Sequence, residues 1–174
     1  MYNNISPWKQ GLYNGQVLSQ LNNLVGDVKN LRLGVAVSGG ADSVSLLMAL
    51  NSICSSLTLP LFVITVNHNI RPKEETYGDA LYVEQLCNNI KENNQNLTFL
   101  LKELKPGLVS EISQKRGGGI EEAARFLRYS AFEEFILENN LDYLCLAHNK
   151  NDQEETLLMR FLQGSGVDAG SGIC

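Results

Sequence analysis

One stretch of the chain, Leu31 to Leu50, combines three local patterns in a row. Residues 31–37 form an apolar run rich in Val and Leu, which predicts a buried strand. A short glycine-containing turn follows, and then Val44–Leu50 crowds apolar residues together as a buried helix does. Backbone N–H groups at such a helix start point at an anion, and the helix dipole favours its negative charge. The order therefore predicts a phosphate site formed by Ser38, Gly39, Gly40, Ala41, Asp42 and Ser43.

Two familiar phosphate loops do not fit this turn. A Walker A loop needs Lys followed by Ser or Thr after its second Gly, and the chain lacks that pair here. No G-x-G-x-x-G dinucleotide fingerprint can be aligned either. The plainer alternative is an ordinary turn in which Asp42 or Ser43 caps a helix. Each residue alone favours the cap, but the six residues together favour the phosphate site.

The rest of the chain alternates predicted strands and helices. A length of 174 residues with 44% hydrophobic and 19% charged residues suits one α/β domain. We expect strands at 61–66, 97–101 and 143–147, and helices at 16–30, 75–92 and 120–140. A further helix is expected after His148, running through Leu162, whereas Ser110–Gly119 reads as a solvated loop, with a mobile lid or a nucleic-acid contact as alternatives.

This alternation predicts right-handed crossovers and a parallel sheet. The expected fold class is a Rossmann-like, three-layer α/β/α domain with about five strands. We expect residues 1–30 to be a helical segment packed on the core, and residues 31–174 to be the main domain, continuing beyond residue 174.

Four loops should meet at the carboxyl edge of that sheet, where open parallel sheets bind ligands: 38–43, 67–71, 117–121 and 148–152. His68 is either a nucleotide contact or an ordinary loop histidine. Asp152 can hold Mg²⁺ or simply suit a helix dipole. One face of a predicted helix collects charged side chains that can bind phosphate or carboxylate or form a surface salt-bridge stripe: Glu121, Arg125 and Arg128.

Charge, hydrophobicity and cysteine usage limit the partners and the cellular compartment that we expect for the protein. The net charge of −5 indicates no general nucleic-acid surface, although a local basic patch would be enough to bind one. No apolar run approaches the roughly 20 residues of a membrane span, so we expect no membrane partner, and the N-terminus lacks a secretory pattern. The four cysteines are scattered without C-x-x-C, which favours buried free thiols in a reducing cytoplasm.

The loops resemble those of the tRNA(Ile)-lysidine synthetases, a branch of the PP-loop ATP pyrophosphatases. The resemblance extends from residue 31 to about residue 170. Its four motifs are Ser38-Gly-Gly-Ala-Asp-Ser43, Val66-Asn-His-Asn-Ile-Arg-Pro72, Ile120-Glu-Glu-Ala-Ala-Arg-Phe-Leu-Arg-Tyr129, and His148 to Gly166. The first motif marks the whole superfamily, and the other three in this order are more specific.

The resemblance implies ligation of L-lysine to the wobble cytidine of tRNA(Ile) with a CAU anticodon, using ATP and Mg²⁺. Residues 38–43 and His68 would contact ATP, while Asp42 and Asp152 would position Mg²⁺. Arg125 or Arg128 would hold phosphate or lysine, with Glu121 also on the substrate side. His148, like His68, is a candidate for nucleotide contact or proton transfer. A cytoplasmic location is expected, and the resemblance leaves a homodimer open.

Some positions depart from the family pattern. Asn149 and Asn151 stand where a second His and the first Asp of a pair are usual, and Gln163 precedes Gly164 where Arg is usual. Three alternatives stay open: tRNA 2-thiolation, amidation, and a non-catalytic nucleotide- or RNA-binding module. The absence of C-x-x-C pairs argues against a cluster-dependent thiolase. Asn151 and the expected truncation relative to the family are the only support for a non-catalytic module.

Overall fold

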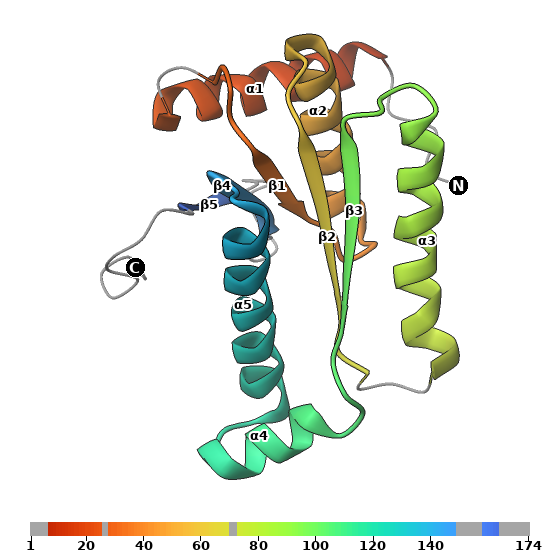
Figure 1. Cartoon of the computed structure of the whole chain (residues 1–174), viewed down its shortest axis with the longest axis vertical. Coiled ribbons are helices and arrows are strands. Elements are labelled where there is room, and N and C mark those ends of the chain that lie inside the picture. The colour runs from red at the N-terminus through yellow and green to blue at the C-terminus, as the bar shows by residue number, and fades with distance from the viewer. Residues whose placement is uncertain (1–6, 26–27, 70–72, 149–157, 164–174) are drawn as a thin grey trace.

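The computed structural model describes residues 7–25, 28–69, 73–148 and 158–163, which form a three-layer α/β/α fold (Figure 1). The strands are β1 (Leu33–Ala36), β2 (Leu61–Asn67), β3 (Leu97–Glu103), β4 (Tyr143–His148) and β5 (Leu158–Gln163). The helices are α1 (Pro7–Val25), α2 (Ala41–Leu57), α3 (Lys73–Lys91), α4 (Leu108–Arg116) and α5 (Ile120–Asn139).

The five strands form one sheet in the order β3-β2-β1-β4-β5. The first four strands are parallel, as the alternation of elements predicted. The central strand β1 lies between β2 and β4, with Val35 opposite both Val63 and Cys145. The carboxyl ends of these strands therefore meet at one edge, close to the start of α2.

Alternate residues of the strands face two different helical layers. Val35 and Val63 pack with α1, α2 and α3 in one apolar cluster, whereas Phe62 and Ile64 pack with α5 in another. This period of two is what a sheet covered on both faces requires. Leu21 of α1 is fully buried in the first cluster, but a separate segment at residues 1–30 stays a prediction.

The end of the chain differs from the sequence-based expectation. We expected a helix through Leu162, but residues 158–163 form β5, which runs antiparallel to β4 with Leu144 opposite Leu162. A short apolar run does not by itself distinguish a buried helix from a strand. The unpaired edge of β4 decides the outcome here, because its backbone groups need hydrogen-bond partners.

Two helices were also misplaced along the chain. Helix α4 occupies most of Ser110–Gly119, which we expected to be a loop, and Gly117 ends it with a left-handed φ of 70°. Lys115 pairs with Glu111 one turn earlier at 2.6 Å, a spacing that favours helix. Helix α1 begins at Pro7 and ends at Val25, earlier than the expected range of 16–30.

The cysteine prediction is confirmed where the chain is described. Cys54, Cys87 and Cys145 are buried free thiols, and burial raises the pKa of Cys54 and of Cys87 to about 12. Cys174 lies outside the described residues. Within the described ranges, no helix has the length and apolar character needed to cross a bilayer.

Candidate functional site

The glycine turn after β1 has the geometry of an anion cradle. Gly39 adopts a left-handed φ of +88°, which L side chains rarely adopt, and Gly40 returns to extended backbone immediately before α2. No side chain caps α2, so neither Asp42 nor Ser43 serves as the conventional helix cap. The first N–H groups of the helix therefore lack a side-chain cap, as a phosphate site requires.

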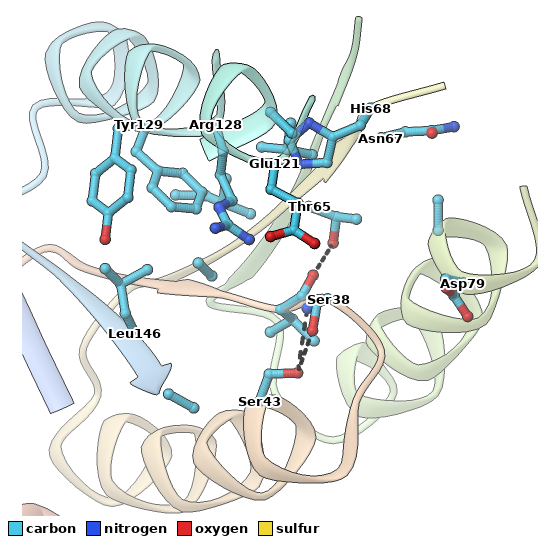
Figure 2. A pocket seen from close by; sticks show the side chains of 18 of the residues that line it. Ser38, Ser43, Thr65, Asn67, His68, Asp79, Glu121, Arg128, Tyr129 and Leu146 are labelled. Carbon is cyan, nitrogen blue, oxygen red and sulfur yellow. Dashed lines mark hydrogen bonds between the residues drawn. The ribbon is translucent and has the colours of Figure 1, made fainter. Parts of the chain in front are cut away.

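Hydrogen bonds of the Ser43 side chain stabilise the conformation of the turn. Its hydroxyl donates to the Gly40 carbonyl oxygen at 2.9 Å and accepts from the Ser38 N–H at 3.3 Å. The two serine hydroxyl oxygens also lie 3.3 Å apart (Figure 2). Ser43 is buried, whereas Ser38 is exposed. The loop is thus braced by its own side chains, and its outward surface stays open.

The neighbouring strand β2 adds a second group of polar side chains. Thr65 donates from Oγ1 to the Val37 carbonyl oxygen at 2.9 Å, which ties β2 to the end of β1. Asn67 is only 4% exposed, and its Oδ1 accepts from the Asn69 N–H at 3.0 Å. Its Nδ2, however, is buried without a partner among the described residues. A buried unpartnered donor is costly, and functional sites are a common place for one.

His68 follows Asn67 and carries a second unpartnered buried atom, Nδ1. Burial, together with the positive charge of Arg128, lowers the pKa of His68 below its ordinary value of 6.5. The imidazole is therefore neutral at pH 7 and can accept a hydrogen bond or a proton. Nδ1 is thus not used for the backbone hydrogen bond of the plainer alternative, an ordinary loop histidine.

Helix α5 supplies the charged side of the site. Glu121 and Arg128 extend toward Ser38 from the same face of α5 (Figure 2). Neither side chain forms an ion pair with another residue in the described part of the chain. Arg125 is exposed and lies with its guanidinium carbon 5.7 Å from the centre of the Tyr129 ring. Arg128 is thus the arginine that faces the loop.

These groups enclose a pocket of about 540 Å³, which is within the usual range for small-molecule sites. Its apolar wall comes from the ends of β1, β2 and β4 and from α5, and includes Ala36, Ile64, Tyr129, Phe132 and Leu146. The pocket combines an apolar wall with the two serines that flank the glycine turn, a guanidinium and a neutral imidazole. This combination suits a nucleotide, which has a flat base at one end and phosphates at the other.

A family model described as a PP-loop domain matches residues 13–174. The chain belongs to the PP-loop family. It is 48% identical over 143 residues to the tRNA(Ile)-lysidine synthase of Treponema denticola, a match that covers 82% of this chain and 30% of that protein. The chain therefore spans less than a third of the length of this relative.

Solved structures of low sequence identity share the fold. The U34-tRNA thiolase NcsA of Methanococcus maripaludis matches with a TM-score of 0.61 at 21% identity, over 78% of this chain and 44% of the thiolase. The NH3-dependent NAD synthetase of Campylobacter jejuni matches with a TM-score of 0.53 at 17% identity, over 78% and 55% of the two chains. Both likenesses support the α/β/α architecture of a PP-loop domain.

The structure brings together many, but not all, of the residues that the sequence singled out. Ser38, Ser43, His68, Glu121 and Arg128 line one pocket. The other residues of the PP loop, which are Gly39, Gly40, Ala41 and Asp42, do not line it. Asp42 lies half-buried in the first turn of α2, and its negative charge adds to burial in raising the pKa of Tyr13 on α1 to about 12.

Two predicted residues cannot be placed in the pocket. His148 is the last residue of β4, but its side chain lies outside the described part of the structure, as does the whole of Asp152. The departures at Asn149 and Asn151 also fall outside the described residues. The roles of these four positions stay predictions.

The lining residues that sequence reasoning did not single out include Asp79 and Tyr129. Tyr129 ends the α5 motif quoted above and could have been found by extending the helical face of Glu121, since residues eight positions apart share one face. Asp79 gave no signal, because an exposed Asp on an amphipathic helix is the ordinary solvent-facing residue.

The donor set fits a magnesium ion that is held partly by phosphate. Two carboxylates, Asp79 and Glu121, and the hydroxyls of Ser38 and Ser43 line the pocket, and Mg²⁺ prefers such oxygen donors. The described residues contain no cluster of three His, Cys, Asp or Glu side chains that would form a protein-only metal centre. Mg²⁺ commonly uses one or two carboxylates together with phosphates and water, which this pocket can provide.

Proposed function

We propose that this PP-loop domain carries the ATP-dependent chemistry of a tRNA(Ile)-lysidine synthetase. The reaction would join L-lysine to C2 of the wobble cytidine in a CAU anticodon, through an adenylated tRNA, and release AMP and pyrophosphate. The observation that carries the proposal is that the two serines flanking the glycine turn, just before and just after the uncapped start of α2, line one pocket with Arg128 and His68. The name and 48% identity of the Treponema denticola relative support the choice among PP-loop reactions.

The first step places negative charge where the PP loop can receive it. The C2 oxygen of cytidine attacks the α-phosphate of ATP, a new P–O bond forms, and the bond to the bridging oxygen of pyrophosphate breaks. The N–H groups at the start of α2 would stabilise the departing pyrophosphate as dipoles already in position. Bracing of the turn by Ser43 supports this role, because the donors then need no reorganisation.

Arg128 and His68 are suited to the α-phosphate. The planar guanidinium of Arg128 binds two oxygens at once and has no competing ion pair in the described structure. A neutral His68 can accept a hydrogen bond or a proton from cytidine or lysine. We assign no role in this step to Arg125, because it lies outside the pocket lining, and its sequence-based role stays a prediction.

In the second step an amine of lysine attacks C2, and the bond from C2 to the adenylated oxygen breaks so that AMP leaves. Glu121 extends into the same pocket without a partner and would hold an ammonium group of lysine. Mg²⁺ would supply positive charge at the phosphates, with Asp42 and Asp152 as the predicted ligands. We place the reaction in the cytoplasm, and a homodimer stays a prediction.

The other PP-loop reactions have less support on this chain. The two structural neighbours are named as a thiolase and an NAD synthetase, but identities of 21% and 17% support the fold only. None of the residues lining the pocket is a cysteine, and the three described cysteines are buried in the core. A non-catalytic binding module would require that the pocket bind ATP without releasing AMP.

The test is a lysine-incorporation assay with the Treponema denticola enzyme as a positive control. The chain is incubated with ATP, Mg²⁺, labelled lysine and tRNA(Ile) with a CAU anticodon, and a GAU-anticodon tRNA serves as the matched control. We expect AMP and tRNA-bound label with the CAU form only. AMP without tRNA-bound label would redirect the substrate assignment, and ATP binding without AMP would support the non-catalytic module.

A further inference from the structure

We propose that Asp79 is a magnesium-facing carboxylate that makes pyrophosphate and ATP binding depend on a divalent cation. The inference rests on the proposed function of the PP loop as a phosphate site. Asp79 belongs to α3, far in sequence from the loop, and neither the loop motif nor the α5 motif includes it. It lines the same pocket as Ser38 and Ser43.

Asp79 on α3 lies beside Gly39 of the PP loop. A Cβ placed on Gly39 would lie 3.5 Å from the Cβ of Asp79, 3.7 Å from its carbonyl oxygen and 3.8 Å from its Cα. These are ordinary van der Waals separations. Because the backbone of α3 fixes the Cβ, Cα and carbonyl oxygen of Asp79, the packing of the helix holds this residue beside the loop. Figure 2 shows Asp79 on α3, across the loop from Ser43.

The charge of Asp79 opposes an anion in the cradle. Its side chain is exposed and makes no hydrogen bond or ion pair with another described residue, so no cation of the described chain neutralises it. Two like charges about 4 Å apart in water weaken binding roughly fivefold, and a low local dielectric increases the penalty. A phosphate site with an uncompensated carboxylate at its rim therefore penalises a bare polyphosphate.

A divalent cation reverses the sign of this effect. Mg²⁺ keeps several waters and is typically held by one or two carboxylates together with substrate phosphates. With Mg²⁺ on the pyrophosphate, the Asp79 carboxylate faces a cation directly or across a water. The same residue then strengthens binding of the magnesium complex and weakens binding of the free anion.

The other carboxylates of the site are placed for different partners. Glu121 comes from α5 on the side of the pocket that also carries Arg128 (Figure 2). Asp42 is on the loop but does not line the pocket, and its charge acts on Tyr13 of α1. Asp79 combines a position beside Gly39 of the loop with a place in the pocket lining.

A carboxylate at the edge of a nucleotide site can also bind a ribose hydroxyl. Inorganic pyrophosphate separates the two roles, because it has no ribose. A metal-facing Asp79 affects pyrophosphate and ATP alike, whereas a ribose-binding Asp79 affects ATP alone.

The experiment measures binding of inorganic pyrophosphate and of ATP by calorimetry, with saturating Mg²⁺ and with EDTA. Wild type is compared with Asp79→Asn, Asp79→Glu and Glu84→Gln. Glu84 is an exposed carboxylate on the same helix that does not line the pocket, so its variant controls for the loss of one negative charge. Unfolding midpoints of the four proteins establish that each is folded.

The signature is a change of sign. For Asp79→Asn we expect pyrophosphate affinity to rise about threefold to fivefold in EDTA and to fall by a similar factor in Mg²⁺. Asp79→Glu should retain a wild-type dependence on Mg²⁺, and Glu84→Gln should match wild type in both buffers. The proposal is overturned if Asp79→Asn behaves as wild type, if affinity changes in one direction in both buffers, or if ATP alone is affected.

The outcome separates this proposal from the proposed function. If wild type binds pyrophosphate and ATP but Asp79→Asn retains the same dependence on Mg²⁺, the PP loop stands as a phosphate site and only the role of Asp79 fails. If wild type binds neither anion under either condition, the phosphate site fails, and this inference fails with it.

Discussion

The two sides of the pocket achieve recognition in different ways. On the PP-loop side, the polar side chains shape the backbone: Ser43 is bonded to Gly40 and Ser38, and no side chain caps the main-chain N–H groups at the start of α2. Beside β2, two buried side-chain nitrogens have no partner among the described residues, Asn67 Nδ2 and His68 Nδ1. A rigid backbone cradle suits a group that is the same in every turnover, whereas side chains suit the group that reacts.

The largest expected effect on activity comes from a variant of the PP-loop backbone. Gly39→Ala should lower the rate of AMP release about 100-fold, because misaligned donors lose the stabilisation of the leaving group. The added methyl group has space beside Asp79, so the left-handed φ of +88° is the main cost, about 1 kcal/mol of unfolding free energy. Release of AMP and urea unfolding measure the two effects.

Gly107→Ala is the matched control for that variant. Gly107 also has a left-handed φ, of +82°, with nothing within 4 Å of an added Cβ, and it lies outside the pocket. It should cost a similar unfolding free energy and leave AMP release unchanged. Equal AMP release from both variants would contradict a special role for the PP-loop backbone.

The next effect tests the side-chain half of the comparison. Arg128→Ala should reduce kcat/KM for ATP about 100-fold, because a bidentate, partly buried contact to phosphate is lost. Arg125→Ala should reduce it less than about threefold, since an exposed side chain outside the pocket is removed. Steady-state AMP release at varied ATP distinguishes them, and a larger loss for Arg125 would overturn the assignment.

A smaller effect sharpens the distinction between shaping and binding. Ser43→Ala removes the donor to Gly40 and should cost about 1 kcal/mol of unfolding free energy. It should also slow AMP release about fivefold, as the cradle loosens. Ser56→Ala removes an equivalent bond on α2, from Ser56 to the Ile53 carbonyl at 2.8 Å, and should leave AMP release unchanged. Loss of activity in both variants would point to α2 as a whole.

The smallest expected effect is a pH dependence of stability. The pKa of His68 is lowered by burial and by Arg128, so the unfolded chain binds its proton more tightly than the folded chain. Its contribution to stability is present above the ordinary value of 6.5 and is lost as pH falls toward the lowered pKa. His68→Gln should flatten this part of the profile of urea midpoint against pH. An unchanged slope would locate the titration elsewhere.

Much of the fold could be predicted from the sequence because the strongest sequence patterns are local. The apolar, β-branched run at residues 61–66 and the buried stripe of α3 depend on neighbours in the chain, and both elements appear as predicted. Strand β5 could not be recognised in this way. Its conformation depends on pairing with β4, which is a contact between segments rather than a property of either one.

The candidate site also contains residues that local sequence patterns predicted and residues that only the packing of the fold reveals. The glycine turn could be predicted from the sequence. The left-handed position and the helix start without a side-chain cap are both occupied by glycine, at Gly39 and Gly40. Asp79 was invisible because its proximity to Gly39 comes from the docking of α3, and an isolated Asp has no pattern. The choice of Arg128 over Arg125 likewise required the structure. It depends on how α5 is rotated about its axis, and a spacing of three residues does not determine that rotation.

The most direct test of the account follows the α-phosphate of ATP in the absence of lysine. The chain is incubated with Mg²⁺, ATP labelled at the α-phosphate and tRNA(Ile) with a CAU anticodon, and the label on the RNA is measured before and after lysine is added. The account predicts that labelled adenylate accumulates on the tRNA and is discharged as AMP when lysine arrives. Release of ADP and phosphate, or AMP formation with no adenylate on the tRNA at any time, would contradict it.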